Sequence, residues 1–150
     1  MIAAVDSGLH HVGWSIFDGA RLVACGLWRD DVRRPQVLPA PEGIERVTQE
    51  VPKIYRGQKK KVRPQDLLNI SARGGYVCGL LVRNSELATH KLIAPRDWKG
   101  TIDGDAFLDR ILGRLGLSER ALIKACGCPP YLEHNVIDAV GIGLWEVGRL

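Results

Sequence analysis

The sequence predicts an α/β protein that folds as one domain over residues 1–150. Short apolar runs of strand length fill the first 28 residues, and a helical stripe of apolar side chains follows at 64–84. Residues 86–94 return to strand character, and 133–147 carry the apolar face of a last helix. A chain of 150 residues suits one domain with one hydrophobic core.

The composition excludes several classes of protein. Hydrophobic residues make up 45% of the chain, which is typical of a globular protein and not of a disordered one. No segment has enough consecutive apolar residues to cross a bilayer, and the start lacks a signal-peptide pattern, so we expect a cytoplasmic protein with no membrane partner. Cys25 and Cys78 lie in apolar runs and are predicted core residues. Cys126 and Cys128 lack the second cysteine pair of a closed zinc site.

The first seventeen residues predict a hairpin. Ile2–Val5 and Val12–Phe17 are strand-like runs, and Asp6-Ser7-Gly8 between them is a turn signature. Asp6 then ends the first, central strand, where a carboxylate is unfavourable unless a metal ion or a lysine pairs with it. The alternative is that Asp6 accepts backbone hydrogen bonds in an Asx-turn.

A second acidic residue follows at the end of the fourth predicted strand. Asp18-Gly19 turns into a third strand at 21–28, an irregular proline-rich segment covers 29–41, and Ile44–Glu50 is the fourth strand. If that strand lies parallel beside the first, Glu50 and Asp6 share one sheet edge and repel each other unless a divalent cation bridges them. The alternative is an ordinary surface glutamate.

A basic segment comes directly after Glu50. It holds six of the chain's 21 basic residues and no acidic one, so the rest of this chain of net charge +4 is net negative. Clustered positive charge with an aromatic ring fits contact with a phosphate backbone and base stacking, whereas the alternative is a solvated, mobile loop. The predicted DNA-binding residues here are Lys53, Tyr55, Arg56, Lys59, Lys60, Lys61 and Arg63.

A long helix is predicted from Pro64 to about Asn84, with Asp66 complementing the dipole of its first turn. Gly74 and Gly75 in its middle cost about 1 kcal/mol each relative to alanine. That cost indicates that another backbone packs closely there, either a sheet or a partner chain. Gly74, Gly75 and Tyr76 are therefore the predicted dimer face.

The remaining elements are a fifth strand at 86–94 and helices at 105–115, 118–125 and 133–147, with Ser118 as the N-cap of the second. Lys99, after the fifth strand, either points to the acidic edge or is an exposed lysine, and its local sequence favours exposure. His134 and Asn135 lie four and three residues before Asp138, on a neighbouring helix surface. Such residues suit metal binding, but Asn135 could instead cap the helix beside an incidental histidine.

Together, the distant acids Asp6, Glu50 and Asp138 and the basic segment match the needs of two-metal phosphodiester hydrolysis, and carboxylates suit Mg²⁺ or Mn²⁺. Four segments also carry the pattern of a known family: Asp6-x-Gly8 with Gly13, Glu50 before a basic loop, Ala72-Arg73-Gly74, and Asp138-Ala139. On these segments the chain resembles the RuvC family of Holliday-junction resolvases, in the RNase H-like superfamily. The first and last segments are the specific ones, and the middle two match in order and spacing.

The resemblance has departures. The family usually carries an acid or histidine three residues before its last aspartate, where this chain has Asn135, with His134 one residue earlier. Lys99 matches the first of the family's basic residues after the fifth strand and is a further predicted DNA-binding residue. The second is not evident at 104–106. The short chain and the segment 29–41 suggest a divergent branch, of bacterial or phage origin.

The resemblance implies an RNase H-like fold: a five-stranded mixed sheet, three antiparallel strands and then parallel ones, flanked by helices. It implies a homodimer that holds a four-way DNA junction and nicks two opposed strands. Two Mg²⁺ ions would be held by Asp6, Glu50 and Asp138. The fourth position would be filled by His134, as ligand or proton carrier, or by Asn135, as ligand. No nucleotide cofactor is implied. Three alternatives stay open. The first is an actin-like or sugar-kinase ATPase, although such folds need two domains. The others are a non-catalytic DNA-binding module and an RNase H-like nuclease that acts on flaps or single strands.

Overall fold

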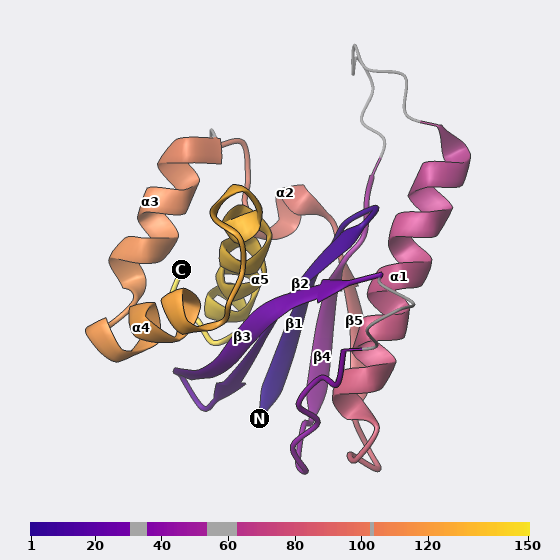
Figure 1. Cartoon of the computed structure of the whole chain (residues 1–150), viewed down its shortest axis with the longest axis horizontal. Coiled ribbons are helices and arrows are strands. Elements are labelled where there is room, and N and C mark those ends of the chain that lie inside the picture. Colours follow the sequence, from indigo (N-terminus) through magenta and orange to yellow (C-terminus); the bar gives the residue numbers. More distant parts are fainter. Residues whose placement is uncertain (31–35, 54–62, 103) are drawn as a thin grey trace.

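The structure is a computed structural model that describes residues 1–30, 36–53, 63–102 and 104–150, the side chain of Asp105 excepted. One sheet runs through it with strand order β3-β2-β1-β4-β5 (Figure 1). The hairpin pairs β1–β2 and β2–β3 are antiparallel, and β1–β4 and β4–β5 are parallel. The strands are β1 (Ile2–Ser7), β2 (His11–Asp18), β3 (Arg21–Arg29), β4 (Arg46–Glu50) and β5 (Thr89–Ile93). The predicted five-stranded mixed sheet is confirmed.

Helices cover both faces of this sheet. In Figure 1, α1 lies on one face, and α3, α4 and α5 lie on the other. The helices are α1 (Pro64–Val82), α2 (Pro95–Trp98), α3 (Gly104–Arg114), α4 (Leu117–Ala125) and α5 (Glu133–Glu146), with a 3-10 turn, η1, at Pro130–Leu132. No helix among the described residues is long and apolar enough to span a membrane.

A hydrophobic cluster lies on each face of the sheet, one under α5 and one under α1. The central strand β1 contributes side chains to both, because successive side chains of a strand point to opposite faces. Ala4 packs into the cluster under α5, whereas Ala3 and Val5 pack into the cluster under α1. All three are fully buried. Cys25 and Cys78 are buried in these two clusters, one in each, as predicted.

Several element boundaries differ from the sequence prediction. Asp6 and Ser7 continue β1 and do not form the turn, because Asp6 pairs with Gly13 on one side and with Glu50 on the other. Strand β4 begins two residues later than expected, at Arg46. Residues 95–98 form the short helix α2, in a stretch for which no helix was predicted.

The prediction that Ser118 caps the helix after residue 116 is wrong. Helix α4 begins at Leu117, so Gly116 is its N-cap residue. The Glu119 carboxylate accepts the Gly116 N–H at 2.9 Å, which satisfies a free donor of the first turn without a serine hydroxyl.

The glycine pair in α1 has a clear structural reason at its first position. A Cβ on Gly74 would lie 2.0 Å from Ser7 Oγ and 2.4 Å from Gln49 Nε2, so only a residue without a side chain fits there. The close neighbour is therefore the sheet, and the prediction that Gly74 belongs to a dimer face is wrong. Tyr76 is 58% exposed on the same helix.

Candidate active site

Two acids stand side by side at the carboxyl end of the central parallel strands. Asp6 of β1 and Glu50 of β4 are direct partners in the parallel register. The backbone N–H of Val51 continues the next ladder by donating to the Ile93 carbonyl of β5 at 2.9 Å. Glu50 is therefore fixed in the sheet on both sides.

Helix α5 brings the third acid, Asp138, to the same edge. A Cβ on Gly13 of β2 would lie 1.9 Å from the Asn135 carbonyl oxygen, so a glycine lets the helix backbone approach the strand. Buried Ser15 on the same strand donates to the Ala139 carbonyl at 2.8 Å. These two contacts hold the start of α5 against β2, the neighbour of β1.

The three carboxyls influence one another electrostatically. Burial raises the pKa of Asp6 well above its usual range, and the negative charges of Glu50 and Asp138 raise it further against the opposing charge of Lys99. Burial also raises the pKa of Glu50 and of Asp138, while nearby donors lower them in part. The fold thus holds three acids where their charged forms are unfavourable, which is typical of a functional site.

Two consecutive residues at the end of α2 donate to two of these acids. Trp98 Nε1 donates to Glu50 Oε2 at 2.5 Å, and Lys99 Nζ lies 3.5 Å from Asp138 Oδ1. The Lys99 side chain is 25% exposed and also lies over the Phe107 ring, so the expectation of a freely exposed lysine is wrong. Trp98 was not predicted, because only the folded chain places its indole beside Glu50.

His134 and Asn135 lie at the start of α5, next to Asp138. His134 is exposed, and its charge lowers the pKa of Asp138. Asn135 is half-buried, and its Nδ2 donates to the Leu132 carbonyl at 3.1 Å. The alternative that Asn135 caps the helix is wrong, because Leu132 holds the N-cap position and no side chain caps it.

Of the predicted DNA-binding residues, Lys53, Arg63 and Lys99 are described, and Lys53 and Arg63 are exposed. They follow β4 and precede α1. Tyr55, Arg56, Lys59, Lys60 and Lys61 lie outside the described residues.

A buried amide lies beneath the acids and was missed by the sequence analysis. Gln49 is 2% exposed, and its Nε2 donates to Ser7 Oγ at 3.2 Å and to the Ser71 carbonyl at 2.9 Å. Its Oε1 lies 3.0 Å from His90 Nε2. One side chain therefore ties β1, β4, β5 and α1 together below Asp6 and Glu50. The sequence predicted a strand at 44–50 but not which of its side chains face α1, so nothing in the sequence pointed to Gln49.

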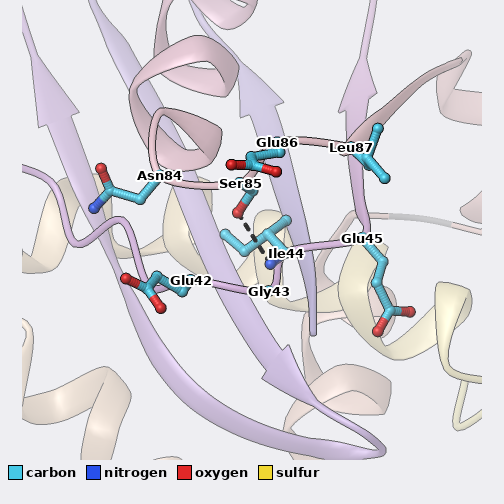
Figure 2. A pocket seen from close by; sticks show the side chains of 8 residues that line it. All are labelled: Glu42, Gly43, Ile44, Glu45, Asn84, Ser85, Glu86 and Leu87. Atoms are coloured by element: carbon cyan, nitrogen blue, oxygen red, sulfur yellow. Dashed lines mark hydrogen bonds between the residues drawn. The ribbon is translucent and has the colours of Figure 1, made fainter.

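A hollow at the opposite end of β4 does not share these features (Figure 2). Its eight lining residues include three glutamates and no basic residue, and the Ile44 N–H donates to Ser85 Oγ at 3.1 Å across it. An acidic lining repels the phosphates of DNA. The hollow is therefore not a site for nucleic acid.

The donor set at the acidic edge fits a hard divalent cation. Asp6, Glu50 and Asp138 offer carboxylate oxygens, and their mutual repulsion is relieved by a bridging cation. As the side chains stand, no three His, Cys, Asp or Glu residues of the described chain converge closely enough to hold an ion. Glu50 instead accepts a hydrogen bond from Trp98, and Asp138 accepts one from Lys99. A cation would have to displace these two donors or bind beside them.

The similarity of this chain to known proteins lies in its fold. No protein-family model and no curated protein matches the sequence. The structure of Thermus thermophilus RuvC matches over 97% of this chain and 94% of its own, with 16% identity and a TM-score of 0.52. A structure of T. thermophilus RuvC in complex with a Holliday junction substrate matches over 98% and 94%, with 16% identity and a TM-score of 0.49. The chain is RuvC-like in fold and divergent in sequence.

Proposed function

We propose that the protein is a metal-dependent endonuclease that resolves four-way DNA junctions by paired, symmetric nicks. The observation that carries this proposal is the meeting of Asp6, Glu50 and Asp138 at one sheet edge, within a RuvC-like fold. Three partly buried acids with raised pKa values have no evident structural purpose, because their repulsion destabilises the fold.

Asp6, Glu50 and Asp138 are the proposed ligands of Mg²⁺ or Mn²⁺, with two ions in each site. When bound, the ions activate the attacking water and neutralise the leaving oxygen. The neighbouring side chains are suited to assist. Lys99 brings a positive charge to within 3.5 Å of Asp138, close to where a phosphate would bind. His134 is exposed beside Asp138 and would carry a proton or bind metal, and Asn135 offers its amide oxygen as an alternative ligand.

The proposed partner is branched DNA, held through the basic segment that follows Glu50. Lys53 and Arg63, at the two ends of that segment, are exposed. We assign the phosphate contacts to the segment as a whole, with Tyr55 stacking near the branch point, because one-signed charge with an aromatic ring suits a nucleic-acid backbone. No nucleotide cofactor enters the proposal.

Paired nicks need two active sites, so the proposal includes a twofold homodimer. Helix α1 carries exposed apolar residues, Leu68 at 64% and Tyr76 at 58% exposure, and the Tyr76 ring also contacts Trp28 of β3. The exposed surface of α1 around Leu68 and Tyr76, and not Gly74, is the proposed dimer face. A protein of this function would work in the cytoplasm of a bacterial cell or a phage-infected host.

A nicking assay tests the proposal. Purified protein is incubated with a four-way junction, a flap and a plain duplex, each with Mg²⁺ and with EDTA. We expect symmetric nicks in the junction with Mg²⁺, none with EDTA, and junction binding without nicking by Asp6→Asn. Preferential flap cutting would indicate a more general RNase H-like nuclease, and binding without metal-dependent nicks would indicate a non-catalytic module. Undiminished cutting by Asp6→Asn would refute the site assignment.

A further inference from the structure

Trp98 occupies an unusual position for a buried tryptophan. Its side chain is 6% exposed, and its indole N–H reaches Glu50 Oε2 at 2.5 Å. Buried indole N–H groups need a hydrogen-bond partner, and a charged acceptor makes the bond strong. Here the partner is one of the three acids and not a backbone carbonyl.

The chain around Trp98 holds it in one place. Helix α2 begins directly after β5, and its Asp97 carboxylate accepts the Ala94 N–H at 2.7 Å. The Lys99 N–H donates to the Pro95 carbonyl at 2.9 Å, which closes the helical turn. Since β5 pairs with β4 up to Glu50, the backbone that carries Trp98 is tied to the strand that carries its acceptor.

The indole ring is also packed against the helix that carries Asp138. Its partner on one side is Phe107 of α3, edge-on at 5.1 Å between ring centroids. On α5, a Cβ at Gly141 would lie 2.7 Å from Trp98 Cζ3, so the glycine makes room for the ring. Gly141 lies three residues after Asp138, on the same side of the helix. The ring therefore touches the helix of one acid while it bonds to another acid.

The chemistry of indole suits this place. The N–H can donate but cannot accept, and it carries no charge. A lysine or arginine beside Glu50 would neutralise the carboxylate and compete with a cation, whereas an indole fixes one oxygen and leaves the negative charge in place. The second oxygen, Oε1, accepts no hydrogen bond from the part of the chain that the structure describes.

We infer that Trp98 is a positioning residue for the proposed cation site: it holds Glu50 by Oε2 at the sheet edge and leaves Oε1 to a divalent cation that draws in Asp6 and Asp138. This inference rests on the proposed function. Groups that orient metal ligands in this way typically change metal affinity by about 10–100-fold when they are removed.

The test measures Mn²⁺ binding to the free protein, without DNA, from the electron paramagnetic resonance signal of unbound Mn²⁺. Trp98→Phe keeps an aromatic ring and removes the donor. Replacing Trp98 by 3-benzothienylalanine keeps the shape of the indole and puts sulfur where the N–H was, so this second variant decides if the phenylalanine variant folds poorly. Trp14→Phe is the matched control, because Trp14 is also buried and its Nε1 has no hydrogen-bond partner in the described part of the chain.

We expect both Trp98 variants to bind Mn²⁺ about 10-fold more weakly or worse, with Trp14→Phe unchanged. Excess Mg²⁺ should restore much of their junction cutting, as weaker metal binding predicts. A benzothienylalanine variant with wild-type Mn²⁺ affinity would overturn the inference and leave the proposed function standing. A wild-type protein that neither binds Mn²⁺ nor cuts would overturn the proposed function itself, and the inference with it.

Discussion

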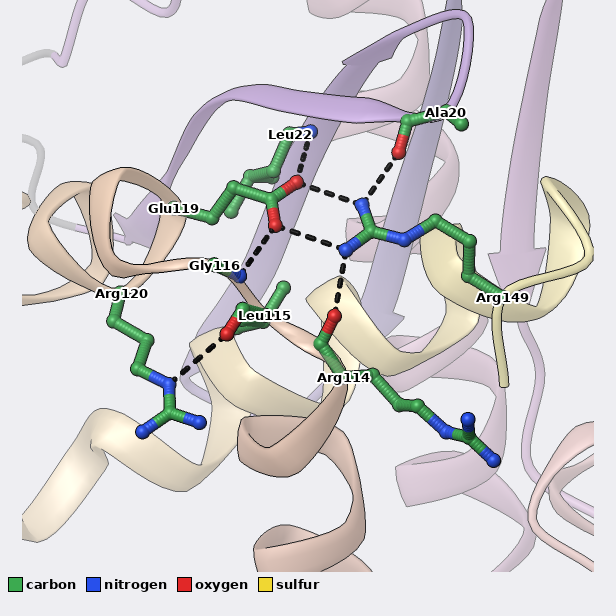
Figure 3. A network of polar contacts seen from close by, with 8 residues as sticks. All are labelled: Ala20, Leu22, Arg114, Leu115, Gly116, Glu119, Arg120 and Arg149. Carbon is green, nitrogen blue, oxygen red and sulfur yellow. Dashed lines mark hydrogen bonds and ion pairs between the residues drawn. The ribbon is translucent and has the colours of Figure 1, made fainter.

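The two ends of the sheet treat buried carboxylates in opposite ways. At one end, Glu119 of α4 is 6% exposed and accepts both arms of the Arg149 guanidinium, at 2.7 and 2.9 Å (Figure 3). It also accepts the backbone N–H groups of Leu22 and Gly116. Arg149 holds the pKa of Glu119 to about 2. At the other end, burial raises the pKa values of Asp6, Glu50 and Asp138, and negative neighbours raise those of Asp6 and Glu50 further, while the positive charge of Lys99 opposes all three shifts.

The contrast separates a structural acid from candidate catalytic ones. Arg149 also donates to the carbonyls of Ala20 and Arg114, so the ion pair joins the β2–β3 turn to α3 and α4. That carboxylate is satisfied by the folded chain itself. The three acids at the opposite edge are satisfied only in part, and this difference predicts which end responds to metal ions.

The largest expected effect comes from removing a carboxylate at the unsatisfied end. Asp6→Asn should lower the rate of junction nicking by about 10³-fold or more, because the loss of one member of a cooperating group disables the group. The check is a single-turnover nicking assay with Mg²⁺. Glu119→Gln at the satisfied end should leave the rate per folded molecule unchanged, and a comparable loss in both variants would erase the contrast.

At the satisfied end, Arg149→Ala should destabilise the protein by about 3 kcal/mol, because it leaves Glu119 charged, buried and without its cation. Urea denaturation measures the loss. The matched control is Arg120→Ala, which removes one hydrogen bond from Nε to the Leu115 carbonyl and should cost about 1 kcal/mol. Equal losses in the two variants would show that the Glu119–Arg149 ion pair contributes no more to stability than a single hydrogen bond.

Removing a charge has the opposite effect on stability at the acidic edge. In EDTA, Asp138→Asn should stabilise the protein by about 1 kcal/mol, since it removes a charge that repels Asp6 and Glu50. A gain of this size raises the melting temperature of a domain of this length by about 2–4 °C. Lys99→Met, which removes the opposing positive charge, should lower it. A drop in melting temperature with Asp138→Asn would contradict the repulsion.

The pH dependence of stability should show the contribution of Glu119 at one end of the sheet and of the three acids at the other. The folded pKa of Glu119 is about 2, below its ordinary 4.5, so its contribution is complete above pH 4.5 and is lost as the pH falls toward 2. The raised pKa values of Asp6, Glu50 and Asp138 have the opposite consequence. Their carboxyls keep protons in the folded state that the unfolded chain has released, so they reduce stability as the pH rises from their ordinary values through the raised ones.

Thermal melts across pH in EDTA and in Mg²⁺ check this expectation. Mg²⁺ should restore stability on the alkaline side and have little effect near pH 4, where the acids at the edge are protonated. Arg149→Ala should weaken the loss of stability on the acid side and leave the alkaline side alone. A Mg²⁺ effect of equal size at all pH values would count against binding by these three acids.

The sequence was sufficient to predict the strands, the long helix and the place of Asp6 and Glu50 at one edge of the sheet. Apolar runs encode the strands, and the ends of neighbouring parallel strands must share an edge, which brings Asp6 to Glu50. Gly13 and Gly74 also stood out in the sequence. The structure shows that the backbone of α5 approaches Gly13, and that the side chains of Ser7 and Gln49 approach Gly74.

The rest depended on contacts between distant segments. Trp98 and Gln49 act through side chains whose partners lie 48 and 22 to 42 positions away, and no local pattern encodes such pairs. Lys99 was expected at the surface for the same reason. Ser118 failed as a cap because Glu119, one residue later, accepts the Gly116 N–H and also binds Arg149.

A crystal soaked with Mn²⁺ tests the central claim most directly, because the anomalous scattering of manganese locates each ion without reference to activity. We predict peaks between the carboxylates of Asp6, Glu50 and Asp138, with Glu50 still bonded to Trp98, and no peak at Glu119. Peaks only elsewhere on the molecule, with the three acids unchanged at saturating Mn²⁺, would contradict the account.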